Sequence, residues 1–265
     1  MPFLLKEIQE VLYRKNGDVL LYAGENWPFW DEATEAFRSQ IKKKLKGTKL
    51  VRAVFLLMDS LVGECAEDYG IVCKPGCSLC CHRMPMCTTL EMQLIAEYLK
   101  SKPQEHAAPV LSEAMTKAVG YESLVSAHNH KRRITAPGEE TDGQFEFTDP
   151  CPFLGEHALC EIYPVRPIDC RVVRATGMAC VHVPAPERRF LKFVLDQIAC
   201  DIISKEEQRI FGGLCVAPMA NWLNSKEFQK ILFGTTDLDP MDRELCPALE
   251  EAFQHMFRLF RHIHY

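Results

Sequence analysis

The sequence has no long apolar segment and no excess of positive charge. The longest apolar stretch, residues 50–58, contains Arg52 and is far shorter than the about 20 residues that a transmembrane helix needs. The formal net charge is −5 over 265 residues, so there is no basic field of the kind that attracts nucleic acid. We therefore expect neither a membrane-spanning nor a nucleic-acid-binding protein.

Several common motifs are also missing. The sequence contains no G-x-G-x-x-G, no P-loop and no H-E-x-x-H, so nothing predicts a Rossmann-type methyltransferase or a nucleotide hydrolase. The first residues reach charge at Lys6 and Glu7 and lack the apolar core of a signal peptide. We expect a cytoplasmic protein, in a compartment where thiols stay reduced.

Cysteine, by contrast, is abundant: the chain has 13, an odd number. In a reducing compartment this points to metal binding or redox chemistry rather than to structural disulfides. Two segments rich in proline, glycine and polar residues, CKPGCSLCC and CPFLGEHALCEIYPVRPIDCR, are suited to converge on a metal, and thiolates suit zinc or iron–sulfur. Their seven cysteines are the predicted ligands: Cys73, Cys77, Cys80, Cys81, Cys151, Cys160 and Cys170.

The spacing of these cysteines bears on the kind of site. Cys77-x-x-Cys80 is the spacing of a metal knuckle. Cys80 and Cys81 are adjacent, and neighbouring side chains diverge on a helix or a strand, so we expect this pair to serve two ligand sets or a cluster larger than one ion. Seven cysteines could supply a four-ligand and a three-ligand site, or one cluster with supporting thiols. Cys180 and His82 are possible additional ligands.

The other cysteines and the nearby arginines have weaker patterns. Cys65, Cys87, Cys200, Cys215 and Cys246, taken singly, are expected to be small buried hydrophobic residues. A zinc ion held by four thiolates carries a formal charge of −2, which nearby arginines would offset. Of Arg166, Arg171 and Arg174, we expect the first two to hydrogen-bond the sulfurs.

The apolar spacing and the capping signals predict a mostly helical fold with little strand: a helical domain with two irregular cysteine-rich loops joined by a metal site. We expect an N-terminal helical region (1–70), a cysteine-rich metal-binding domain (71–186) and a C-terminal helical region (187–265) within one compact unit. The predicted helices are 31–46, 49–68, 88–100, 108–128, 188–208, 217–232 and 241–262, with strand signals at 19–22, 145–147 and 160–163.

CKPGCSLCC followed by CPFL and then CEIY-x-x-RP-x-x-CR resembles the YkgJ-type CxxCxxCC family, described as zinc- or iron-chelating proteins, which also includes flagellin lysine N-methylase. The resemblance covers roughly residues 73–171 and rests on the seven cysteines, Ile162-Tyr163 and Arg166-Pro167. Here the first spacing is Cys-x3-Cys rather than Cys-x2-Cys. The resemblance implies that the seven cysteines bind zinc, or iron as a cluster such as 4Fe-4S.

Cys73-x3-Cys77-x2-Cys80 is also the spacing of the radical S-adenosylmethionine motif. There the motif opens a barrel of alternating strands and helices and has an aromatic residue before its last cysteine, whereas this chain has helical flanks and Leu79. We reject that fold, although a cluster with an open iron is still chemically possible.

Three functions follow from these patterns. The first is a protein that binds zinc or an iron–sulfur cluster through two cysteine-rich loops, where the metal contributes to folding. The second, implied by the methylase branch of the family, is an iron–sulfur and S-adenosylmethionine-dependent methylase of protein lysines, which would need a protein substrate. The third is a thiol redox or metal-trafficking protein, although no βαβ context surrounds Cys77-x-x-Cys80. We favour the first.

Overall fold

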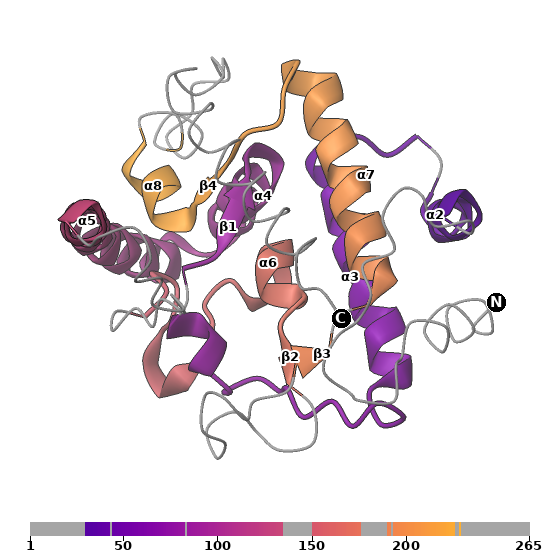
Figure 1. Ribbon diagram of the computed structural model, residues 1–265, viewed down its shortest axis with the longest axis horizontal. Helices are drawn as coiled ribbons and strands as arrows, with labels where there is room; N and C mark the ends of the chain where they lie inside the picture. The colour runs from indigo at the N-terminus through magenta and orange to yellow at the C-terminus, as the bar shows by residue number, and fades with distance from the viewer. Residues whose placement is uncertain are drawn as a thin grey trace.

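The computed structural model describes residues 30–42, 44–82, 84–134, 150–175, 190–191, 193–225 and 228, and these residues are mostly helical with little strand, as the sequence predicts (Figure 1). The strand signals at 19–22 and 145–147 and the helix at 241–262 lie outside the described residues, as do Cys180 and Cys246. The division at residues 70 and 186 is still a prediction.

The described helices differ in length from about one turn to about eight. The α-helices are α2 (Trp30–Ser39), α3 (Thr48–Cys65), α4 (Thr89–Lys100), α5 (Gln104–Ile134), α6 (Ile168–Arg171), α7 (Val194–Phe211) and α8 (Met219–Asn224). Three short 3-10 turns lie in the cysteine-rich segments: η1 (Leu79–His82), η2 (Glu156–Ala158) and η3 (Tyr163–Val165).

Two short antiparallel strand pairs connect segments that are distant in the sequence. Strand β1 (Met86–Thr88) pairs with β4 (Val216–Pro218), with Cys87 opposite Ala217. Strand β2 (Arg174–Ala175) pairs with β3 (Phe190–Leu191). The first pair attaches the residues just after η1 to the chain that follows α7, and the second attaches the end of the cysteine-rich region to the start of α7.

Four element predictions were wrong in detail. The helix predicted over 188–208 begins only at Val194, after Phe190–Leu191 pair as strand β3. The helix predicted over 31–46 ends at Ser39, and the one predicted over 217–232 is helical over 219–224 and begins only after the β4 pairing. The strand predicted at 160–163 is absent among the described residues: Cys160 forms a single bridge to Leu154, and a 3-10 turn follows. Pro164, which has no backbone N–H to donate, favours that turn over an extended ladder.

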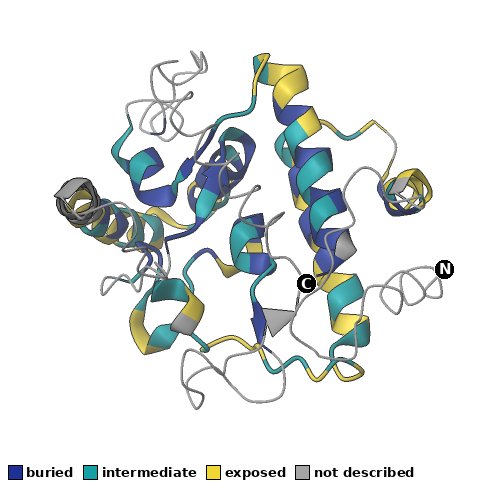
Figure 2. Cartoon of the chain, viewed as in Figure 1, coloured by how far each residue is buried: buried dark blue, intermediate teal, exposed yellow. Residues whose placement is uncertain are grey.

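The hydrophobic core lies where α3 and α7 run side by side and α4 packs against both (Figure 1). In Figure 2, α4 is largely buried, whereas α3 and α7 alternate between buried and exposed positions. This is the pattern of amphipathic helices at a core surface, and each fully buried large apolar side chain stabilises the fold by about 1.5–3 kcal/mol. On α3 the buried stripe consists of Val51, Val54, Phe55 and Met58.

The start of α4 carries the predicted capping box and a second, unpredicted carboxylate. Thr88 and Glu91 cap each other's backbone N–H groups, so the predicted start is confirmed. Glu207 reaches from α7 and accepts a hydrogen bond from the Leu90 N–H. Helix starts leave such N–H groups without intrahelical partners, so Glu207 joins α7 to α4 at a point where a backbone donor needs an acceptor. Its burial raises the pKa of the Glu207 carboxyl to about 7.

Replacing Glu207 by glutamine is expected to flatten the dependence of stability on pH. Since folding raises the pKa of this carboxyl from 4.5 to about 7, its contribution to stability is full below pH 4.5 and is lost as the pH rises through about 7. The loss amounts to about 3 kcal/mol. Urea unfolding of the parent and of Glu207→Gln at pH 5 and pH 8 measures it.

Glu64→Gln, at an exposed position of α3, is the matched control for the loss of one carboxylate. Between pH 5 and pH 8, the free energy of unfolding of the parent and of the control should fall by more than that of Glu207→Gln. Equal slopes in the parent and in Glu207→Gln would contradict the assignment of a raised pKa to this carboxyl.

Candidate metal centre

One cavity of about 370 Å³ collects all seven of the predicted ligand cysteines. It lies beside the C-terminal turns of α3, and its wall includes Val62 and Gly63 from that helix and Met219 from α8. Three segments that are far apart in the sequence supply the thiols. They are 73–81, 151–160 and the α6 turn, which carry Cys73, Cys77, Cys80 and Cys81, then Cys151 and Cys160, then Cys170.

The first segment enters the cavity wall directly after α3. The Val72 N–H donates to the Ala175 carbonyl at 3.0 Å, and the Ala175 N–H donates to the Cys73 sulfur, also at 3.0 Å. Pro75 and Gly76 then form a turn, and Gly76 has a φ of 86°, a conformation that favours glycine. This turn reverses the chain and brings Cys77 back to the cavity.

The adjacent pair in η1 faces the cavity. Cys80 and Cys81 both line it, although they are neighbours in the sequence. The Cys81 thiol hydrogen-bonds to that of Cys80, and this bond, together with burial, raises the Cys81 pKa well above its ordinary value. The expectation that the pair serves two ligand sets or one cluster stays a prediction.

The second segment is attached to the first through backbone and side-chain contacts. The Cys151 N–H donates to the Cys81 carbonyl, and the Cys151 sulfur lies 3.9 Å from the sulfur of Met219. Cys160 is brought back by its bridge to Leu154, whose carbonyl accepts a hydrogen bond of 2.8 Å from Lys117 on α5. The loop between the two cysteines is thus closed on itself and tied to α5.

The turn that carries Cys170 is held by two carboxylates that the sequence analysis did not single out. Glu91, at the start of α4, accepts a hydrogen bond of 2.7 Å from the Ile168 N–H, and it is fully buried. Asp169 accepts one of 3.0 Å from the Met86 N–H of β1. The capping box revealed Glu91 as a helix start, but its second contact joins residues 77 positions apart and has no local sequence signal.

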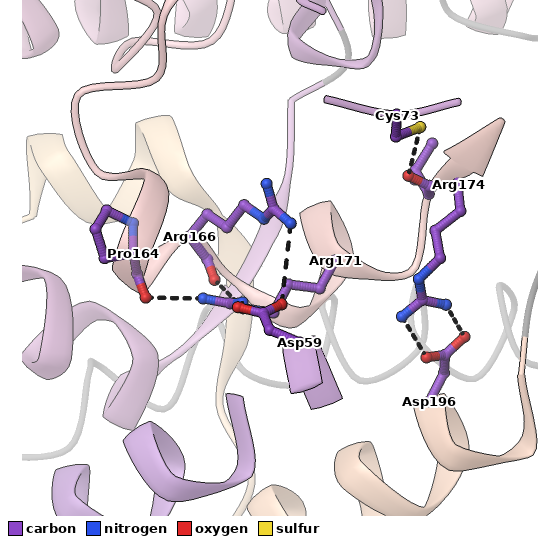
Figure 3. A network of polar contacts seen from close by, with 8 residues as sticks. Asp59, Cys73, Pro164, Arg166, Arg171, Arg174 and Asp196 are labelled. Atoms are coloured by element: carbon purple, nitrogen blue, oxygen red, sulfur yellow. Dashed lines mark hydrogen bonds and ion pairs between the residues drawn. The ribbon is translucent and has the colours of Figure 1, made fainter. Parts of the chain in front are cut away.

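Arg171 and Arg174 donate to carboxylate and carbonyl oxygens near the cavity rather than to the sulfurs. The Arg171 guanidinium pairs with Asp59 and donates to the carbonyls of Pro164 and Arg166 at 2.9 Å each. Arg174 makes a two-pronged ion pair with Asp196, at 2.8 Å for both contacts (Figure 3). For Arg171 the expected hydrogen bond to a sulfur is therefore replaced by contacts to Asp59 and two carbonyls.

Arg166 is different because one of its donors is not used. Its guanidinium lies over the Tyr163 ring at 3.9 Å and is 4.0 Å from an Asp59 oxygen. Its Nε is buried and has no hydrogen-bond partner among the described residues. Arg166 lines the same cavity as the cysteines.

The electrostatics of the cavity disfavour free thiolates. Burial raises the pKa of the Cys151 thiol to about 12, and it also raises the pKa of Cys73, Cys160 and Cys170. Neighbouring thiols add to the effect, because a second negative charge nearby disfavours ionisation. The site is therefore neutral at ordinary pH unless a cation binds and offsets the charge of the thiolates.

Seven thiols are donors that suit a soft metal, but their side chains are not arranged around one point as ligands of an ion would be. In the part of the chain that the structure describes, no three cysteine, histidine, aspartate or glutamate side chains are arranged as a metal-ion site. Neutral thiols make hydrogen bonds to one another and to backbone groups instead, as Cys73 and Cys81 do. Seven thiols in one cavity are nevertheless the donors that zinc and iron–sulfur clusters prefer. Binding would require the side chains to turn towards the ion.

The other candidate ligands are not part of this wall. His82 is half-buried in η1 and is not among the described residues that line the cavity. Cys87 is fully buried in the core. Three more cysteines are partly buried and pack against the core, as expected for small hydrophobic residues: Cys65, Cys200 and Cys215.

Comparison with known proteins gives one match. No curated protein and no solved structure matches the chain significantly. In the described residues, no helix is both long and apolar enough to cross a membrane. Residues 72–201 match a family model described as a "putative zinc- or iron-chelating domain", and this span holds all seven cysteines of the cavity. Over residues 72–201 the chain is therefore similar to the CxxCxxCC family, as its cysteine pattern predicts.

Proposed function

We propose that this protein binds zinc or an iron–sulfur cluster through the thiolates of Cys73, Cys77, Cys80, Cys81, Cys151, Cys160 and Cys170. The observation that carries the proposal is that all seven line one cavity, although they come from three segments of the chain. Cysteines that serve only as small hydrophobic residues have no reason to gather in this way. The family match supports the same chemistry.

The number of thiols bears on the kind of centre. A single structural zinc ion takes four ligands, so seven thiols exceed what one ion needs. Two neighbouring ions or one cluster with additional thiols would both use the set. In either case the metal would connect the loop after α3 to the loop before α6, and its binding energy would stabilise their arrangement.

Metal and acid-labile sulfide analysis of protein purified without oxygen is the direct test. Zinc without colour, at about one or two ions per chain, would indicate closed thiolate sites. Iron with matching sulfide and a broad absorption would indicate a cluster. In that case S-adenosylmethionine would be the next ligand to test, by calorimetry under anaerobic conditions. Protein without metal, in which Cys77 and Cys80 form a reversible disulfide, would contradict the proposal and favour thiol redox chemistry.

Substitution of a cavity cysteine connects the metal to these residues. Cys170→Ser is expected to lower the bound metal to less than half of the parent value, because it removes one thiolate from the set. Cys200 lies on α7 and packs against the core, outside the cavity. Cys200→Ser is therefore the matched control. Equal metal content in the parent and in Cys170→Ser would count against the assignment of this ligand.

A further inference from the structure

The cations that line the cavity are not equivalent. Arg171 and Arg174 are fully engaged, the first by Asp59 and two carbonyls and the second by Asp196. Lys74 lines the cavity from an exposed position in the first loop. Arg166 therefore stands out as a partly buried cation with a donor to spare.

The geometry around Arg166 holds its guanidinium in place and leaves one edge uncovered. The Tyr163 ring covers one face at 3.9 Å, and Asp59 approaches one terminal nitrogen at 4.0 Å. The Nε edge is buried and unpartnered in the described structure. A buried donor without a partner is unfavourable, so an acceptor at this edge when the site is filled would remove a penalty. The cavity wall offers the carboxylates of Asp59 and Asp169 and the sulfurs of the seven cysteines. Asp59 already pairs with Arg171, and Asp169 accepts from the Met86 N–H, which leaves the sulfurs as the acceptors that metal binding would charge.

Two thiols share the cavity wall with Arg166. Cys73 and Cys160, which come from the first and the second cysteine segment, line the same cavity as Arg166, whose charge favours the ionised form of both thiols. Once both are thiolates, their negative charges repel each other, and a nearby cation offsets that repulsion. A guanidinium is always protonated and presents several donors in one plane, which suits it to this position better than a lysine ammonium.

We propose that Arg166 is a positioning residue for the metal centre: its Nε–H donates to a metal-bound thiolate of the cavity wall, while its charge offsets the charge of the Cys73 and Cys160 thiolates. This inference rests on the proposed function, because it requires a metal in the cavity. It gives Arg166 a different role from Arg171, whose guanidinium donates to backbone carbonyls. Partners that hydrogen-bond metal ligands typically change metal affinity by about 10–100-fold when removed.

The test uses full-length protein loaded with cobalt(II), whose thiolate charge-transfer absorption reports directly on the sulfurs. Arg166→Gln is expected to weaken cobalt binding about 10-fold in competition with a chelator. It should also move the charge-transfer band to longer wavelength, because loss of the donor raises the energy of the sulfur electrons. Arg166→Lys keeps the charge and should restore part of the affinity. Arg38→Gln, which removes an exposed arginine of α2, is the matched control.

The outcomes separate this inference from the proposed function. If the purified parent protein contains neither zinc nor iron and also binds no cobalt, the proposed function fails and this inference with it. If it contains metal but binds no cobalt, the same comparison of Arg166→Gln with the parent is made on the content and absorption of the native metal. If the parent binds cobalt and Arg166→Gln keeps the same affinity and the same band position, the inference alone is overturned. Far-ultraviolet circular dichroism of the metal-free variants shows whether each is folded. Should Arg166→Gln not fold, the affinity and band of Arg166→Lys decide, and parent values there would overturn the inference.

Discussion

With metal in the cavity as proposed, its removal is expected to lower the melting temperature of the protein by about 20 °C or more. Structural zinc in small domains supplies about 10 kcal/mol or more, and one kcal/mol corresponds to about 2–4 °C in a domain of this size. The reason lies in the cavity, where seven thiols from three segments line one wall. Differential scanning calorimetry before and after anaerobic treatment with a chelator measures the change.

Treatment with the chelator should loosen the cysteine-rich segments before it affects the rest of the fold. Hydrogen exchange in the metal-free protein is expected to increase most at residues 73–81 and 150–175, because backbone bonds such as Cys151 to Cys81 join these segments at the cavity. Helix α4, which is largely buried in the core, should keep more of its protection. An unchanged melting temperature in protein shown to be free of metal would rule out a structural contribution of the metal.

Loss of the Arg174 side chain is expected to destabilise the protein by about 3–5 kcal/mol. Arg174 and Asp196 are both buried, and removal of one partner leaves the other as an uncompensated charge. Asp196 also accepts a hydrogen bond of 2.8 Å from the Phe193 N–H at the start of α7. Arg174→Met keeps much of the apolar volume and isolates the loss of charge. Urea unfolding of the parent and the variant gives the difference in free energy.

Two further variants define the origin of this effect. Arg174→Met combined with Asp196→Leu should be more stable than Arg174→Met alone, because no buried charge remains without a partner. Arg209→Met removes a half-exposed arginine whose partner Glu206 still accepts from the Gly47 N–H, and it is expected to cost less stability. A cost for Arg174→Met no larger than that for Arg209→Met would show that the buried pair contributes nothing specific.

The helical part of the fold was largely predictable from local signals. The capping box at Thr88 and Glu91 sets the start of α4, and the apolar spacing on α3 marks its buried stripe. These features depend on residues within one or two turns of each other, so the sequence pattern contains them. The short strands could not be predicted, since Met86–Thr88 becomes a strand only by pairing with residues about 130 positions later.

The sequence by itself determined which cysteines form a set. Their spacing, and the proline, glycine and polar residues around them, distinguish the seven from Cys65, Cys87 and Cys200. Pro75-Gly76 also indicates a turn, and in the structure Gly76 has a φ of 86°, which suits glycine. Such information is local and chemical, and it can be read along the chain.

Only the tertiary structure decided how the set comes together and which groups support it. Cys80 and Cys81 enter one cavity despite their adjacency, and Cys170 reaches it because Glu91 and Asp169 hold its turn. The roles of the arginines were equally undetermined, because they depend on acidic side chains that lie on α3 and α7. Long-range hydrogen bonds and ion pairs of this kind leave no periodic trace in the sequence, since each depends on two positions that only folding brings together.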